Sequence, residues 1–377
     1  MILLKNVTLT GKLTDVLIGG GKILAIGSYA MDERLMSQII DGSGKQLVPG
    51  LIDGHVHPIG GGGEGGFATR TPPLSAHDFL EGGVTTVIGL LGTDGWTRTG
   101  IDLLAHVRGY TIQGIRSFLL SGSYAVPPVS ITKSIAEDIL LINEVIGVGE
   151  IAINDHRSTQ PTVHELARLA SQARIAGLLK GVRGTMNVHV GDGKDALDLL
   201  EEVVETTDIP ITQFLPTHIN RSERIFDAGL RWAKKGGRID FTTCTTEAFI
   251  EEGEIPAGQA LQRALTAGIP LRQITMSSDA GASLPAFDES GKLLRLETGK
   301  PTSIFDAVRD AVQHGVRIED AIQTVTSNVA EAYGISGGDI RQGERADLLL
   351  IDDALQIDTI LAEGHAIMIQ KKWLLPK

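Results

Sequence analysis

The middle of the chain alternates between two hydrophobic patterns, and this alternation limits the possible folds more than any other feature. Short apolar runs typical of buried strands are followed by segments with the periodicity of helices. The strand-like runs are 51–56, 85–91, 116–120, 145–153, 182–190, 211–217, 238–243 and 272–277, and the helical segments include 134–144, 163–176, 195–205, 223–235, 257–267 and 304–314. Eight strands that alternate with helices predict an α/β fold, a (β/α)8 barrel of the TIM type. A doubly wound open sheet is the alternative, since periodicity alone does not exclude it.

The two ends of the chain differ from the middle and resemble each other. Short apolar runs joined by turns cover residues 2–9, 14–18 and 23–26 at one end, and 346–351, 358–361 and 366–369 at the other. We therefore predict one small β-sandwich domain formed by both termini. Its expected parts are residues 1–48 and 339–377, and the barrel is expected over residues 49–338.

The amino-acid composition and net charge exclude several classes of protein. The 377 residues are 42% apolar, which is enough for one large barrel core. A formal net charge of −12 argues against nucleic-acid binding, because phosphate contacts need a basic surface. The one cysteine, Cys244, fits a reducing compartment. We expect no signal peptide and no membrane span of ~20 apolar residues, and hence a soluble cytoplasmic protein.

A pair of histidines, His55 and His57, closes the first predicted barrel strand. Alternate residues of a strand point to the same side, so both imidazoles can reach one metal ion from the barrel interior. A His-x-His pair alone is more often incidental. Its position is the stronger argument, because barrel active sites lie at the carboxyl ends of the strands.

Four further polar residues end later strands. Glu150 lies on the fourth strand, His189 on the fifth, His218 on the sixth and Asp279 just past the eighth. Each alone could be a cap, a structural histidine or a turn residue. Five strand ends that bring imidazole or carboxylate to one mouth favour a metal centre, and this ligand set suits zinc. The histidines expected to be structural are His77, His106, His156, His164, His314 and His365.

Several stretches carry a family resemblance. Residues 50–57 (GLIDGHVH) resemble the opening motif of the amidohydrolase superfamily, and residues 346–351 (ADLLLI) resemble its closing segment. Within that superfamily the chain resembles the isoaspartyl dipeptidases from near residue 15 to near residue 370. The stretches with this closer likeness are 57–64 (HPIGGGGE), 89–94 (GLLGTD), 155–158 (DHRS), 215–221 (LPTHINR) and 277–279 (SSD).

The resemblance implies a metal-dependent enzyme that hydrolyses the β-aspartyl bond of isoaspartyl dipeptides. It implies two divalent metal ions, expected to be Zn2+, bridged by a hydroxide that acts as the nucleophile. His55 and His57 would hold one ion, and His189 and His218 the other. Asp279 would bind the first ion and act as the proton shuttle to the departing amine.

The resemblance also assigns residues to a small, dipeptide-like substrate. Glu64 matches the carboxylate that binds the substrate's α-ammonium group. Arg157 and Arg221 match guanidinium groups that hold its two carboxylates, for which a planar fork suits arginine better than lysine. Tyr124 matches the catalytic tyrosine that donates to the developing oxyanion. The smaller substrate contacts would be Gly62, Thr93 and Ser283, and the family implies a homo-oligomer.

One position departs from the family pattern. The fourth strand typically carries a lysine whose carbamate bridges the two metals, and the corresponding residue here is Glu150. A glutamate also offers one bridging negative charge, but its side chain is shorter by roughly 3–4 Å. The backbone must then approach the metals more closely, which Gly147 and Gly149 could permit. Some other amidohydrolase branches have a glutamate here, so we expect Glu150 to bridge both metals.

Other functions compete with this prediction. A cyclic amide hydrolase of the dihydroorotase or hydantoinase kind would share barrel and metals, but its substrates offer no α-ammonium to Glu64. A metal-poor binding or assembly protein is expected to have lost ligands, and only the bridging residue is altered here. The glycines at 60–63 could cradle a phosphate, but no Gly-Lys-Ser/Thr ending follows them.

Overall fold

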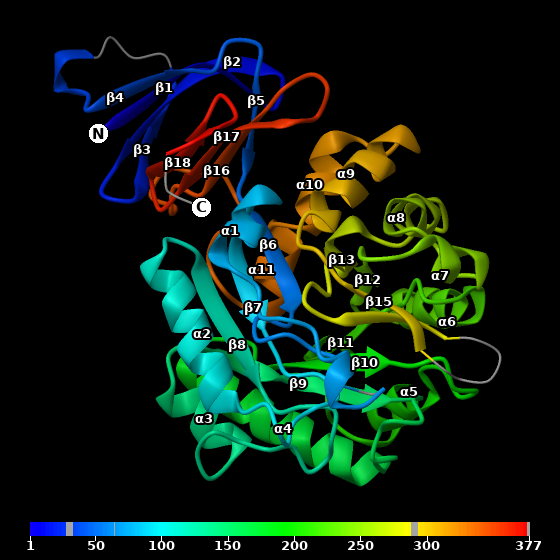
Figure 1. The fold of residues 1–377 in the computed structure, drawn as a ribbon. Coiled ribbons are helices and arrows are strands. Elements are labelled where there is room, and N and C mark those ends of the chain that lie inside the picture. Colours follow the sequence, from blue (N-terminus) through cyan, green and yellow to red (C-terminus); the bar gives the residue numbers. More distant parts are fainter. Residues whose placement is uncertain (28–32, 64, 288–292, 375–377) are drawn as a thin grey trace.

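The computed structural model describes residues 1–27, 33–63, 65–287 and 293–374. The chain forms a sheet built from both ends and a larger α/β part beneath it (Figure 1). No helix in these ranges is long and apolar enough to cross a membrane.

Parallel strands form the centre of the α/β part. Six of them pair in the order in which they occur along the chain, and two later strands pair with each other. The first group is β6 (Leu51–Val56), β7 (Val84–Gly89), β8 (Arg116–Ser121), β9 (Val145–Ile153), β10 (Thr185–Val190) and β11 (Phe214–Thr217), and the second is β12 (Ile239–Thr242) and β13 (Ile274–Ser277). A sequential order without reversal is that of a barrel wall, whereas a doubly wound sheet reverses its order at a switch point.

Backbone hydrogen bonds span the two gaps between these groups. Ile219, just after β11, donates its N–H to the carbonyl of Asp240 on β12 over 3.2 Å. At the other gap, Asp279 N donates to His55 O over 3.0 Å, and His57 N donates to Ala280 O over 2.7 Å. The ends of β13 and β6 are therefore held side by side.

Most of the helices that alternate with these strands bury one face against them; Leu166 and Trp232, for example, are fully buried. A hairpin of β14 (Ser283–Phe287) and β15 (Leu293–Thr298) follows β13. The helices are α1 (Ala76–Glu81), α2 (Gly100–Ile112), α3 (Ile135–Leu141), α4 (Val163–Lys180), α5 (Asp198–Thr206), α6 (Glu223–Lys234), α7 (Glu247–Glu251), α8 (Ala257–Thr266), α9 (Ser303–Gln313), α10 (Ile318–Thr324) and α11 (Ser327–Tyr333).

The strands of the two chain ends form one hydrogen-bonded sheet of nine strands, rather than the two stacked sheets expected of a sandwich. Strand β1 explains the continuity, because it pairs with β2 on one side and with both β4 and β5 on the other. The strands are β1 (Ile2–Leu9), β2 (Lys12–Gly19), β3 (Lys22–Ile26), β4 (Gln38–Asp41), β5 (Gln46–Pro49), β16 (Leu348–Ile351), β17 (Ile357–Ala362), β18 (His365–Ile369) and β19 (Lys372–Trp373).

Strand β16 joins this sheet to the α/β part through its two faces. Successive side chains of a strand point to opposite sides. Leu348 and Leu350 lie in the sheet's own apolar core, whereas Leu349 and Ile351 lie in the core of the α/β part. The unbroken apolar run of this strand follows from burial on both sides.

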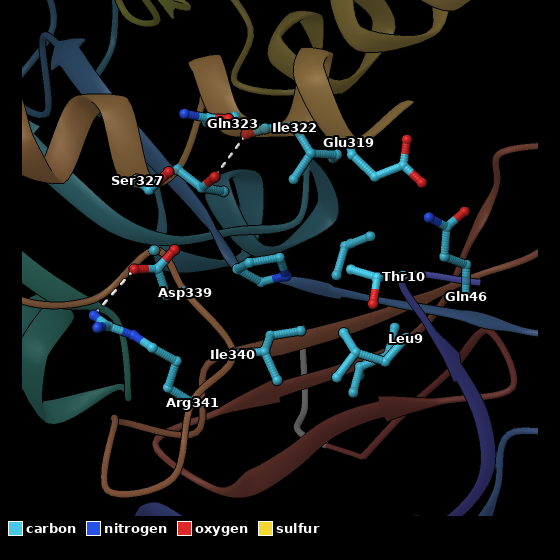
Figure 2. Close-up of a pocket in the computed structure, with 15 residues that line it drawn as sticks. Leu9, Thr10, Gln46, Glu319, Ile322, Gln323, Ser327, Asp339, Ile340 and Arg341 are labelled. Atoms are coloured by element: carbon cyan, nitrogen blue, oxygen red, sulfur yellow. Dashed lines mark hydrogen bonds and ion pairs between the residues drawn. The ribbon is translucent and has the colours of Figure 1, made fainter. Parts of the chain in front are cut away.

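A cavity of about 370 Å³ opens between the terminal sheet and the α/β part (Figure 2). Val48 and Pro49, the last residues of β5, line it, and only Gly50 separates them from β6, so the cavity lies at the amino end of β6. The predicted metal ligands lie at the opposite, carboxyl end. This cavity is therefore separate from the candidate metal centre.

Candidate metal centre

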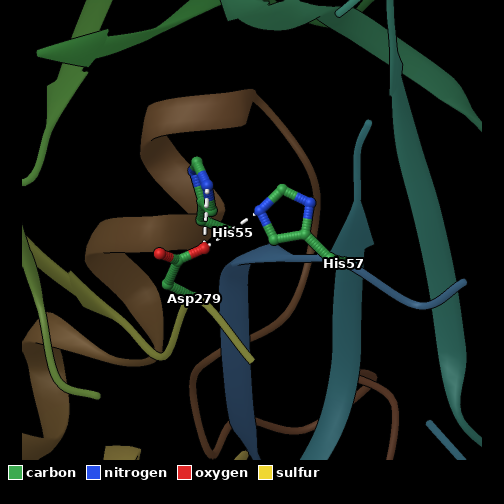
Figure 3. A group of neighbouring side chains, drawn as sticks. All are labelled: His55, His57 and Asp279. Atoms are coloured by element: carbon green, nitrogen blue, oxygen red, sulfur yellow. Dashed lines mark ion pairs between the residues drawn. The ribbon is translucent and has the colours of Figure 1, made fainter. Parts of the chain in front are cut away.

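Three of the predicted ligands meet where β6 and β13 end. His55 lies in β6, His57 directly follows it, and Asp279 closely follows β13. Asp279 Oδ1 lies 3.0 Å from His57 Nε2 and 3.5 Å from His55 Nε2 (Figure 3). One ligand atom from each residue lies within 4.8 Å of the others, a spacing that one cation can span.

Glu150 lies at the centre of the cluster and is 1% exposed. Its Oε2 lies 3.2 Å from His55 Nε2, 3.3 Å from His189 Nδ1 and 3.6 Å from His218 Nε2, and its Oε1 lies 3.6 Å from His57 Nε2. Burial alone would raise the pKa of Glu150, but the surrounding imidazoles hold it well below its usual value. One carboxylate therefore faces all four histidines.

The glycines before Glu150 bring β9 close to β10. A Cβ on Gly147 would lie 2.3 Å from the carbonyl oxygen of Thr185, and one on Gly149 would lie 2.9 Å from the carbonyl oxygen of Asn187. No side chain fits at either position. These glycines thus permit the backbone of β9 to approach β10 closely. Strand β10 carries His189, which lies beside Glu150.

His218 and Asp279 adopt left-handed backbone conformations, with φ of 63° and 56°. This region is unfavourable for residues with a Cβ, and such conformations persist where surrounding contacts impose them. The backbone N–H of Asp279 is held by His55 O, and the side chain of His218 is held by Thr242, whose Oγ1 lies 2.6 Å from Nδ1. Both turns aim the side chains into the cluster.

The two nitrogens of His189 have different partners. Nε2 lies 3.0 Å from Asp155 Oδ2, whereas Nδ1 faces Glu150 and lies 2.9 Å from the hydroxyl of Tyr124. Burial opposes ionisation of Asp155, but hydrogen bonds from His189 and Arg157 hold its pKa well below the usual value. The ionised Asp155 accepts a hydrogen bond from Nε2–H, so Nδ1 is the nitrogen available to a metal, and Tyr124 donates to it.

His55 is oriented by a chain of neutral groups. Its Nδ1 lies 3.1 Å from Asn187 Oδ1, and Asn187 Nδ2 donates to the hydroxyl of Tyr333 over 3.1 Å. Tyr333 in turn donates to the carbonyl of Gly54 over 3.0 Å. An amide oxygen accepts from Nδ1–H, which leaves the lone pair on Nε2, the nitrogen that faces Glu150 and Asp279.

The polar atoms of the cluster fit a metal ion. His55 Nε2 and Asp279 Oδ1 are buried and have no hydrogen-bond partner among the described residues. Burying a polar atom without a partner costs free energy, unless a bound ligand interacts with that atom. Burial also lowers the pKa of His218 to about 3, so this imidazole is neutral and able to coordinate. Imidazole and carboxylate donors at these distances suit zinc and its neighbours.

A family model for the amidohydrolase family matches residues 46–371. The chain belongs to this family. The chain is therefore a metal-dependent hydrolase, and amidohydrolases have the TIM-barrel fold whose parallel strands form the wall described above.

Comparison with individual proteins adds two kinds of relative. A solved β-aspartyl dipeptidase from Fervidobacterium islandicum AW-1, in complex with β-Asp-Leu, is 38% identical, with a TM-score of 0.92 over 100% of this chain and 99% of that one. Adenine deaminases from Oceanobacillus iheyensis and Bacillus subtilis are 26% and 30% identical over 92% and 95% of this chain. The chain spans about half the length of these deaminases, 52% and 55%.

Three small residues expected to contact the substrate of this amidohydrolase lie near the same strand ends. Gly62 packs against Ser283, since a Cβ on Gly62 would lie 3.2 Å from Ser283 Cβ. Thr93 follows β7 and is half-buried. Glu64, the residue expected to bind the α-ammonium group, lies outside the described residues.

The two predicted arginines differ in their surroundings. Arg157 forms a two-pronged ion pair with Asp155, with Nε 2.9 Å from Oδ1 and Nη2 2.7 Å from Oδ2. Arg221 donates its backbone N–H to the carbonyl of His218, which places it next to a candidate ligand. Its Nε is buried and has no hydrogen-bond partner within the described ranges.

Sequence reasoning missed the partners of the ligands. Asn187 lies two residues before His189 on β10, so strand alternation could have placed both on one face. Asp155 stood in a stretch used for the resemblance but received no role. Thr242 gave no signal, because its contact with His218 depends on how the ends of β11 and β12 meet.

Proposed function

We propose that this amidohydrolase hydrolyses the β-aspartyl bond of isoaspartyl dipeptides. The observation that carries the proposal is full-length similarity, at 38% identity, to a β-aspartyl dipeptidase solved with β-Asp-Leu. A cluster of imidazoles and carboxylates at the expected strand ends supports it.

The proposed cofactor is a pair of Zn2+ ions. His55, His57 and Asp279 would hold one, His189 and His218 the other, with Glu150 shared. The central position of the Glu150 carboxylate supports this division. Bound ions would polarise the scissile carbonyl and lower the pKa of water at the site.

The chain's own residues would then move protons and orient the substrate. Asp279 would accept a proton from the attacking water on its carboxylate and deliver it to the nitrogen of the departing amine. Burial raises the pKa of Tyr124 well above its usual value, so its hydroxyl keeps the proton it must donate. With His189 Nδ1 serving as a ligand, the Tyr124 hydroxyl would be free to donate to the substrate's carbonyl oxygen.

The proposed substrate contacts use charge complementarity. Arg157 and Arg221 would hold the two carboxylates, and Glu64 the α-ammonium group. Gly62, Thr93 and Ser283 would supply the smaller contacts. The pairing of Arg157 with Asp155 supports a preset orientation of its guanidinium fork.

We infer the finer organisation as well. The six-stranded and two-stranded groups would close into one (β/α)8 barrel over residues 49–338, with the terminal domain over residues 1–48 and 339–377. We expect a cytoplasmic homo-oligomer. Exposed leucines on the neighbouring helices α3 and α4 support a contact between copies, for example Leu141 at 71% and Leu179 at 73% exposure.

A substrate panel tests the activity. Purified, metal-loaded protein is offered β-Asp-Leu, α-Asp-Leu, dihydroorotate, hydantoin and adenine, and product formation is followed by chromatography. We expect hydrolysis of β-Asp-Leu and none of comparable efficiency for the others. Cleavage of a cyclic amide or deamination of adenine in preference to β-Asp-Leu would refute the proposal.

A further inference from the structure

A carboxylate without an assigned role lies near Arg221. Glu254 stands in the loop between α7 and α8, and its Oε1 is buried with no hydrogen-bond partner in the described part of the chain. Arg221 Nε is likewise buried and has no hydrogen-bond partner among the described residues. Buried polar groups left without partners are costly, and a bound ligand removes that cost.

The loop that carries Glu254 is fixed to the residue before Arg221. Ile255 N donates to Asn220 O over 2.8 Å, and Asn220 Nδ2 donates back to Ile255 O over 2.8 Å. Asn220 also binds Thr242 at the end of β12, with its Oδ1 accepting from Thr242 N over 2.8 Å. These three hydrogen bonds fix Ile255, the residue after Glu254, beside the end of β12 at the barrel mouth.

The charges around Glu254 place it at the edge of the candidate site. Arg221 and Asp279 are the charged groups that act on it. Burial raises the pKa of Glu254 to about 7, while a hydrogen bond from Thr245 and the charge of Arg221 lower it. Among the described residues no ion pair joins Glu254 to Arg221, so the Glu254 carboxylate remains available to a cationic group of a ligand.

We propose that Glu254 selects the residue after the β-aspartyl unit and favours a cationic side chain there. This inference rests on the proposed function. If Arg221 holds a carboxylate of the dipeptide and Glu64 its α-ammonium group, the remaining variable group near Arg221 is the side chain of the second residue. A carboxylate beside it binds ammonium or guanidinium groups and repels acidic ones.

The test compares two dipeptides of matched length, β-Asp-Lys and β-Asp-norleucine, on the metal-loaded protein. We expect wild type to have the higher kcat/KM for β-Asp-Lys, and Glu254→Gln to reduce that preference about tenfold or more. The loss should arise on β-Asp-Lys alone. Glu252→Gln, which changes an exposed carboxylate two residues away, is the matched control and should leave the preference unchanged.

A pH series on wild type gives a second, independent reading. Glu254 is ionised above its pKa and the lysine side chain stays charged, so the preference for β-Asp-Lys should rise between pH 6 and 8 and stay flat in Glu254→Gln. Equal losses on both dipeptides, or no preference in wild type, would overturn the inference while leaving the proposed function intact. Failure of wild type to cleave any β-aspartyl dipeptide would refute the proposed function itself, and this inference with it.

Discussion

Asn187 orients a candidate metal ligand, His55, without being a candidate ligand itself. It accepts from His55 Nδ1 and is itself fixed by Tyr333. Residues that orient metal-binding histidines contribute to affinity by fixing the tautomer and the ring plane. Their effect is therefore measurable on metal binding directly.

We predict that Asn187→Ala weakens zinc binding by roughly 10–100-fold, because His55 loses the acceptor that holds its Nδ1–H and fixes the orientation of its ring. Competition with a coloured chelator measures this affinity. Tyr333→Phe is the control for indirect effects, since it removes the hydroxyl that accepts from Asn187 Nδ2 and donates to Gly54 O but keeps the Asn187 oxygen that accepts from His55. A smaller loss in Tyr333→Phe is expected, and unchanged affinity in Asn187→Ala would contradict the orientation of His55 described here.

Metal binding should also depend on pH through His55. Burial lowers the pKa of His55, but Glu150 and Asp279 raise it to about 9 in the metal-free protein. A metal must displace that proton, so zinc affinity should fall about tenfold for each pH unit below 9. Chelator competition at pH 7 and pH 8 tests the slope, and Glu150→Gln should flatten it. An affinity independent of pH would show that His55 is already neutral.

The candidate ligands could be named from sequence because each lies where a predicted strand ends. Two general rules suffice to place His55, Glu150 and His189 at one end of the barrel. Alternate residues of a strand point to the same side, and barrel active sites lie at the carboxyl ends of the strands. The hydrogen-bond partners of these ligands could not be predicted from the sequence. Hydrogen bonds such as His189–Asp155 depend on side-chain rotamers and loop geometry, about which hydrophobic periodicity gives no information.

At the scale of elements, the strand pattern was predicted well and the connections less so. Strands β1, β6 and β9 have the predicted bounds. The runs 211–217 and 272–277 begin instead as 3-10 turns, Ile211–Gln213 and Leu271–Gln273, each preceded by a proline that sets a turn-compatible φ. The hairpin β14–β15 and the short helix α7 were missed, since runs this short carry little periodic signal.

The contact between β9 and β10 gives an element-scale prediction. Gly147→Ala should lower the free energy of unfolding by about 1–3 kcal/mol, because its Cβ would meet a backbone oxygen that cannot move aside. Thermal unfolding of metal-free protein measures the change. Gly109→Ala in α2, where a Cβ meets nothing within 4 Å, is the control and should be neutral or stabilising. Equal effects at both positions would mean that the strands do not approach as described.

At the scale of the whole molecule, the terminal sheet and the α/β part share buried residues. Leu349 is fully buried and approaches the barrel side, where a Cβ on Gly83 would lie 2.9 Å from its Cδ1. Sequence analysis predicted that both termini build one β unit, but not a single continuous sheet. The pairing of β1 with three other strands has no local sequence signal.

We predict that Leu349→Ala destabilises the entire chain by about 2–5 kcal/mol, because it opens a cavity between the two parts. Denaturant unfolding should remain one transition with a lower midpoint. Leu13→Ala, at a side chain that is 69% exposed, should change the midpoint little. Separate transitions for the two parts would contradict a shared core.

In the proposed enzyme, two metal ions that share Glu150 support hydrolysis of a β-aspartyl dipeptide. The most direct measurement titrates metal-free protein with zinc in bicarbonate-free buffer and follows β-Asp-Leu hydrolysis against metal bound per chain. A glutamate bridge is permanent, so activity should rise and level off at two zinc ions per chain without added bicarbonate. Activity that levels off at one ion, that requires bicarbonate, or that never appears would contradict the account.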